Sequence, residues 1–182
     1  VGDVQLNTHA NTSTGKIEFH VKSDGTQNAF EINGNYNTKD TTGTAMDIVL
    51  AANRLNLNLL EPYLKTVFSE FNGIATGNIR LYGAKDKIYI VGPANISKGS
   101  AVVAFTKCKY LFDQQKINFQ KNLIEINSLL LKDTLGNSGI VSGKIHHHFF
   151  KDFDFENVRM ETSKMLLLNT TKKDNNQFYG TV

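Results

Sequence analysis

Residues 16–36 read KIEFHVKSDGTQNAFEINGNY, and this stretch decides the fold class. Ile17, Phe19 and Val21 alternate with charged or polar side chains, the period of two expected of a β-strand with one apolar face. The letters SDG that follow are a typical turn signal, and Phe30 and Ile32 then resume the alternation. The stretch therefore predicts two strands joined by a turn.

The same alternation continues along the rest of the chain. Apolar residues recur at every second position around residues 55–59, 79–81, 108–112, 117–119, 124–126, 141–145 and 153–155. Turn signals separate the runs, including Asn33-Gly34, Asn72-Gly73, Lys98-Gly99 and Leu135-Gly136-Asn137. A strand with its turn about every 8–12 residues is typical of all-β sandwiches, barrels and solenoids. The sequence therefore predicts an all-β fold.

One segment has the period of a helix instead. Leu60, Leu64, Val67, Phe68 and Phe71 form a single apolar stripe at helical spacing. A proline stands where a first helical turn tolerates it, and a glycine two residues after the stripe is placed to end the helix. We expect a short helix near residues 60–71, either closing one end of the core or serving as a lid over an apolar cavity.

Two runs, residues 87–91 and 165–168, are apolar at nearly every position and predict strands that are apolar on both faces. In a two-layer protein they would be central strands covered on both sides, whereas in a sheet curved into a trough each would present one face to the trough and the other to a neighbouring element. With a single helix expected, the sequence offers little to cover a second face of the sheet. The main question that the pattern raises is therefore what covers this apolar surface.

Composition excludes several functional classes. The 182 residues carry 20 Lys and Arg against 17 Asp and Glu, a net charge of +3 that is too small to favour nucleic acid. Cys108 is the single cysteine, so no internal disulfide or thiolate zinc site is possible. No nucleophile motif, metalloprotease motif or phosphate-binding loop occurs. We therefore expect a protein that is not an enzyme and that has no cofactor.

Two clusters have metal-ligating residue types. His146-His147-His148 would place two imidazoles on one strand face, and Asp152, Asp154 and Glu156 would share a face of a later strand. Polar positions on a solvated strand face give the same pattern. We favour that interpretation and expect no metal.

Three segments together resemble a known family. They are LNLNLLEPYLKTVFSEFNGIATGNIRLYG (residues 55–83), LKDTLGNSGIVSGKIHHHFF (131–150) and MLLLNTTKKDNNQFYGTV (165–182). In this Gly- and Asn-punctuated strand pattern the chain is similar to the TamB family (the inner-membrane subunit of the translocation and assembly module, AsmA-like), particularly the C-terminal region of its Bacteroidetes-type members. The chain departs from the family in lacking Gly-x-x-x-x-Pro after the second strand and in having three histidines where the family has one.

The resemblance implies a fragment of a larger protein. Residues 1–182 would form one β-rich piece, with residues 1–54 as leading strands and 55–182 as the TamB-like segment. The sheet would be a curved, elongated, taco-like trough with an apolar interior. It would lie in the periplasm of a Gram-negative bacterium as part of an inner-membrane-anchored protein, with an Omp85-type outer-membrane barrel as partner.

Such a trough would shield phospholipid acyl chains between the two membranes, because an acyl chain buries its apolar surface there. The candidate lining residues are Ile79, Leu81, Ile88, Ile90, Phe112, Phe119, Ile124, Ile126, Phe153, Phe155, Leu166 and Leu168. The sequence leaves three alternatives open: a chaperone-like module that helps outer-membrane proteins assemble through a free sheet edge, a carbohydrate-binding or adhesin domain, and a closed core filled by the same residues.

Overall fold

The computed structural model describes residues 3–84, 87–148 and 151–182, and it confirms an all-β fold with one short helix. The first half contains β1 (Val4–Asn11), β2 (Lys16–Asp24), β3 (Ala29–Asn37), β4 (Met46–Asn56), β5 (Phe68–Ala84) and β6 (Lys87–Val103). The second half contains β7 (Lys109–Phe112), β8 (Gln115–Gln120), β9 (Leu123–Asp133), β10 (Ser138–His148), β11 (Lys151–Thr162), β12 (Asn169–Thr170) and β13 (Gly180–Thr181).

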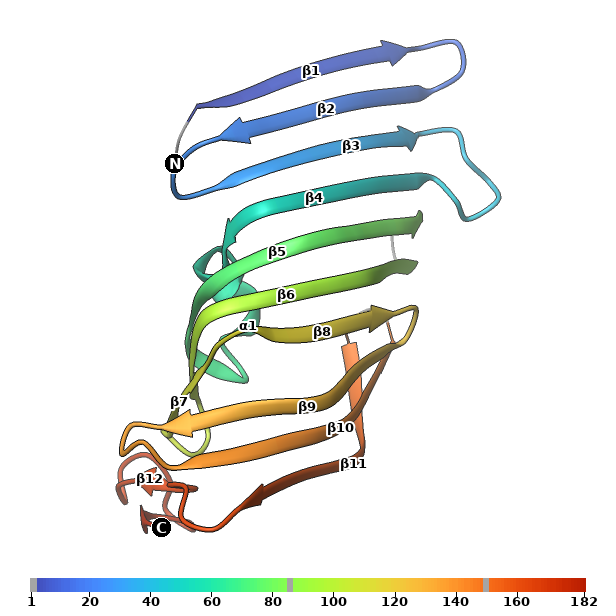
Figure 1. Ribbon diagram of the computed structural model, residues 1–182. Coiled ribbons are helices and arrows are strands. Elements are labelled where there is room, and N and C mark those ends of the chain that lie inside the picture. The colour runs from blue at the N-terminus through green and yellow to red at the C-terminus, as the bar shows by residue number, and fades with distance from the viewer. Residues whose placement is uncertain (1–2, 85–86, 149–150) are drawn as a thin grey trace.

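Strands β1 to β11 form one antiparallel sheet, and β12 pairs with β13. From β1 to β6 each strand pairs with the next one along the chain, and β7 and β8 both connect β6 to β9 before β10 and β11 follow. Figure 1 shows these strands as a single layer, with β5 and β6 bending beside the segment that carries the helix. Residues 4–54 therefore belong to the same sheet as the later strands.

The helix is shorter than the sequence predicts. A 3-10 turn, η1 (Leu57–Leu60), leads into α1 (Glu61–Leu64), and the chain is already in β5 at Phe68. The prediction of a helix through residue 71 was wrong, as was a strand through residue 59. Phe68 and Phe71 instead pair with β6, and their rings stack with centroids 5.3 Å apart. The ladder to β6 outweighs the local helical pattern.

Several of the predicted turns lie inside strands instead. Two of them fall within β5 and β6, which are each 17 residues long. Asn72-Gly73 lies within β5, Asn33-Gly34 within β3, and Lys98-Gly99 at a bulge of β6 where Lys98 has φ 51°. Gly77 has φ 149°, and a Cβ there would collide with the carbonyl oxygen of Pro93 on the neighbouring strand. Glycine at this position permits close backbone approach rather than chain reversal.

Seven of the ten buried apolar residues in the described part of the chain gather in two small clusters, and the other three are alanines. One cluster contains Cys108, Tyr110, Leu131 and Met165, and the other cluster contains Leu57, Ala75 and Ile96. Phe112 packs against both clusters and also covers Gly99, its partner on β6. The core therefore lies where β4 to β7, η1 and β9 meet, while the rest of the sheet has no comparable core.

A buried carboxylate fixes the C-terminal segment to the sheet. Asp133 accepts hydrogen bonds from the backbone N–H groups of Leu135 (2.9 Å), Asn137 (2.8 Å) and Leu166 (2.9 Å), and from the Asn137 side chain (3.0 Å). Tyr110 donates from its hydroxyl to the Leu166 carbonyl at 2.8 Å. These bonds hold residues 165–168 in an irregular conformation, so the strand predicted there was wrong.

Candidate binding faces of the sheet

The register places apolar side chains on one face of the sheet. Residues directly opposite each other on antiparallel strands point to the same side. By this rule Leu6, Val21, Ile32, Leu50 and Ile79 form one row across β1 to β5. A parallel row runs through Phe19, Gly34, Ile48, Leu81 and Ile90, and a third through Gly92, Phe119, Ile124, Ile145 and Phe155. We call this side the apolar face.

Nine of the twelve predicted lining residues lie on the apolar face. They are Ile79, Leu81, Ile88, Ile90, Phe119, Ile124, Ile126, Phe153 and Phe155. Seven of them are half-buried, whereas Phe153 is 46% and Phe155 62% exposed. In the described part of the chain these nine side chains therefore do not fill a closed core.

The other three predicted lining residues have different surroundings. Phe112 lies between the two buried clusters, and Leu166 packs against the cluster around Cys108. Leu168 lies in the irregular segment, where its N–H donates to the carbonyl of Val182 at 3.1 Å. These residues support the sheet at one end and do not extend the row of exposed apolar side chains.

The opposite side, which we call the polar face, carries a row that the sequence did not reveal. Glu18, Asn35, Asp47, Tyr82 and Tyr89 are successive partners across β2 to β6. Each of these residues lies on a different strand, so no local sequence motif indicates the row. Knowledge of the register is needed to find it.

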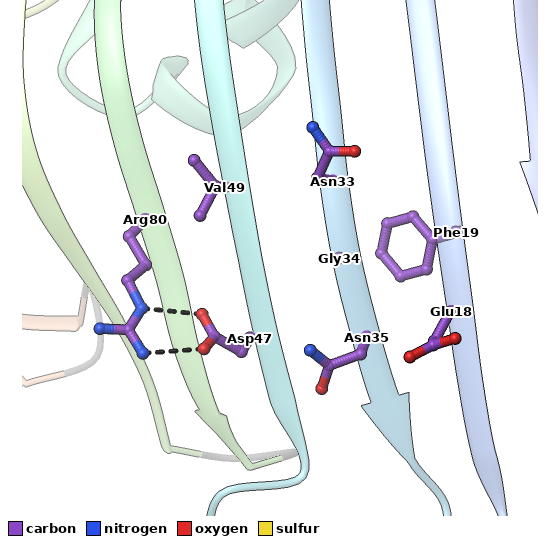
Figure 2. A pocket seen from close by; sticks show the side chains of 8 residues that line it. All are labelled: Glu18, Phe19, Asn33, Gly34, Asn35, Asp47, Val49 and Arg80. Atoms are coloured by element: carbon purple, nitrogen blue, oxygen red, sulfur yellow. Dashed lines mark hydrogen bonds and ion pairs between the residues drawn. The ribbon is translucent and has the colours of Figure 1, made fainter.

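Beside this row lies an open hollow of about 640 Å³. Its lining includes Glu18, Asn33, Asn35, Asp47 and Arg80, and Figure 2 shows these polar side chains around Gly34. Gly34 contributes only backbone, and the Phe19 ring occupies the space beneath it on the apolar face.

Arg80 and Asp47 form the most ordered contact of the hollow. The guanidinium donates from Nε and Nη2 to the two carboxylate oxygens, at 2.7 and 2.8 Å (Figure 2). These hydrogen bonds lower the pKa of Asp47 and raise the pKa of Arg80. Both groups are therefore charged at neutral pH and neutralise each other.

The structure brings one member of the histidine cluster into contact with one member of the carboxylate cluster. His146 on β10 reaches diagonally to Glu156 on β11, with Nε2 and Oε2 2.6 Å apart, and this contact lowers the pKa of Glu156. His147 points to the apolar face, where it is buried beside Phe153 and where burial lowers its pKa. Within residues 3–84, 87–148 and 151–182 no group of three or more ligating side chains could hold a metal ion.

The described residues contain no helix long and apolar enough to cross a membrane. Comparisons with family models, with curated proteins and with solved structures gave no significant match for this chain. The functional argument therefore depends on the two faces of the sheet.

Proposed function

We propose that the sheet is a non-enzymatic, TamB-like module of the periplasm whose apolar face shields phospholipid acyl chains in transit between membranes. The observation that carries the proposal is the set of incompletely buried aliphatic and aromatic side chains that the register places on one face, from β1 to β6 and from β8 to β11. A contiguous apolar surface of this kind on a protein marks a binding site for an apolar partner. The resemblance in residues 55–83, 131–150 and 165–182 supports acyl chains as that partner.

Acyl chains fit this face for a physical reason. Each methylene removed from water contributes about 0.8 kcal/mol, so ten methylenes contribute up to about 8 kcal/mol before the costs of association. A row of Leu, Ile and Phe offers such burial without any specific polar contact, and neighbouring rows would let a chain move along the face. The headgroup would stay in water at the margin of the sheet.

Charged substitutions on the apolar face should abolish lipid retention. We expect the wild-type chain, purified from bacteria, to carry phospholipid or fatty acid in native mass spectrometry and lipid extraction. Leu81→Asp and Ile90→Asp place a carboxylate among the acyl chains, where its desolvation is unfavourable. Because neither side chain is fully buried or belongs to a buried cluster, the variants should remain folded by circular dichroism while losing most of the lipid.

Val91→Asp is the matched control, because Val91 is adjacent to Ile90 and points to the polar face beside Arg80. It should retain lipid at the wild-type level. A wild-type chain that has the bare protein mass, and that takes up nothing from vesicles of phosphatidylethanolamine and phosphatidylglycerol, would argue against the proposal.

A second candidate function uses a sheet edge. In the described residues β1 pairs only with β2, all eight of its residues are exposed, and it contains neither lysine nor proline, which commonly protect edge strands. Such an edge can accept an incoming strand, as a chaperone-like module for outer-membrane proteins and an Omp85-type partner would require. A chain that retains no lipid but binds an amphipathic β-strand peptide from an outer-membrane barrel would favour this alternative.

A further inference from the structure

The hollow on the polar face has the chemistry of a recognition site, and it lies on the side of the sheet opposite the proposed lipid surface. We propose that the hollow and the row Glu18–Asn35–Asp47–Tyr82–Tyr89 bind a neutral oligosaccharide that lies across the strands. We call these five residues the polar row. The inference is independent of acyl-chain binding, because the two sets of residues point to opposite faces.

Charge balance selects the class of ligand. Glu18 is paired with Lys16 at 2.6 Å, and Asp47 is paired with Arg80 through two hydrogen bonds. The hollow therefore presents no excess of positive charge to attract a phosphate or a nucleic acid. It presents carboxylate oxygens, amides and N–H groups, which exchange hydrogen bonds with sugar hydroxyls in either direction.

Asn35 occupies the centre of this site. It is the register partner of both Glu18 and Asp47, and it is half-buried. Among the described residues its side-chain amide makes no hydrogen bond, whereas neighbouring Asn33 is held by His20 (2.7 Å) and Glu31 (2.9 Å). A primary amide carries two donors and one acceptor, so it can bond two adjacent hydroxyl groups of one sugar ring.

Two tyrosines continue the row with aromatic surface. The Tyr82 and Tyr89 rings pack with centroids 5.4 Å apart. Arg80 lies 5.1 Å from the Tyr82 centroid, and Lys121 lies 4.4 Å from the Tyr89 centroid. These cation–π contacts restrict the rings before any ligand arrives. An aromatic surface next to hydrogen-bonding groups suits a pyranose ring, which has C–H bonds on its faces and hydroxyls at its edge.

The spacing of the strands suits a chain of sugars. Neighbouring strands lie about 4.8 Å apart, so the row from β2 to β6 spans about 19 Å. One strand spacing is close to the length of one hexose in an extended chain. A tetrasaccharide laid across the strands would therefore meet a new side chain of the row at each sugar unit.

Tetrasaccharide binding to the full chain tests the inference. The probes are cellotetraose, chitotetraose and maltotetraose, measured by saturation-transfer NMR and calorimetry. We expect at least one to bind, and we expect Asn35→Ala and Tyr82→Ala each to weaken that binding by about tenfold. Asn118→Ala, an asparagine of the polar face on β8, should leave the affinity unchanged.

Three results would overturn the inference. The first is that no tetrasaccharide binds at millimolar concentration. The second is that one binds but keeps its affinity in both Asn35→Ala and Tyr82→Ala, with folding confirmed by circular dichroism. The third is that inorganic phosphate competes with the bound sugar, since a balanced site offers an anion no advantage. Lipid retention, measured separately, reports on the apolar face alone.

Discussion

Replacing Asp133 by alanine is expected to lower the Tm by about 5–10 °C, because a single carboxylate satisfies three backbone N–H groups and one side-chain amide. Without it, the N–H groups of Leu135, Asn137 and Leu166 lose their acceptor in a buried setting. Asp133→Asn should also be destabilising. Each carboxylate oxygen accepts two hydrogen bonds, so in either orientation the NH₂ group of the asparagine side chain would face two hydrogen-bond donors.

Asp133 also predicts a dependence on acid. Burial alone would raise its pKa, but the hydrogen bonds from Asn137, Leu166 and Leu135 prevail and lower it to about 2. A carboxyl with a depressed folded-state pKa stabilises the fold above its unfolded pKa near 4 and loses that contribution as the pH falls toward 2. The stability difference between wild type and Asp133→Ala should therefore shrink between pH 4 and pH 2.

Thermal unfolding followed by circular dichroism across this pH range is the measurement. Asp24→Ala is the control, since Asp24 is an exposed carboxylate whose ion pair with Lys22 should contribute little. A Tm for Asp133→Ala within about 1 °C of wild type would show that the irregular segment around Leu166 is held by other contacts.

Replacing Phe112 by alanine is expected to reduce the free energy of unfolding by about 3 kcal/mol, near the lower end for buried phenylalanines because the ring is only half-buried. The ring packs against both buried clusters and covers Gly99, so its loss opens a cavity between them. Urea unfolding should show a lower midpoint with little change in slope.

Phe105→Ala is the matched control, because Phe105 is 63% exposed and should change stability by less than about 0.5 kcal/mol. Equal effects of the two substitutions would mean that the two clusters are stabilised independently of Phe112.

The sequence predicted the fold class. It also predicted which residues of a single strand point to the same face. Ile88 and Ile90, or Ile124 and Ile126, stand two residues apart, and that spacing alone places each pair on one side. What could not be predicted was which strands pair and in which register. Leu81 and Ile90 face together only because β5 and β6 pair as they do.

The incorrect predictions have a common physical cause, which is contact with residues distant in sequence. Asn33-Gly34 has the letters of a turn, yet Gly34 lies inside β3 because the Phe19 ring of β2 occupies the place of its missing side chain. The helical stripe through Phe71 is overridden by pairing with Ala101. The polar row could not be predicted from the sequence, because Glu18, Asn35 and Asp47 lie on three different strands.

The order of the strands has a consequence for cooperativity. Among the described residues β1 to β5 each pair only with the strands next to them in the chain, so this part of the sheet resembles a one-dimensional array. The buried clusters lie near its inner end, while β1 has no fully buried side chain. Unfolding should therefore begin at β1 and proceed inward, strand by strand. Native-state hydrogen exchange would register this as amide protection that rises steadily from β1 to β6, rather than as one shared value.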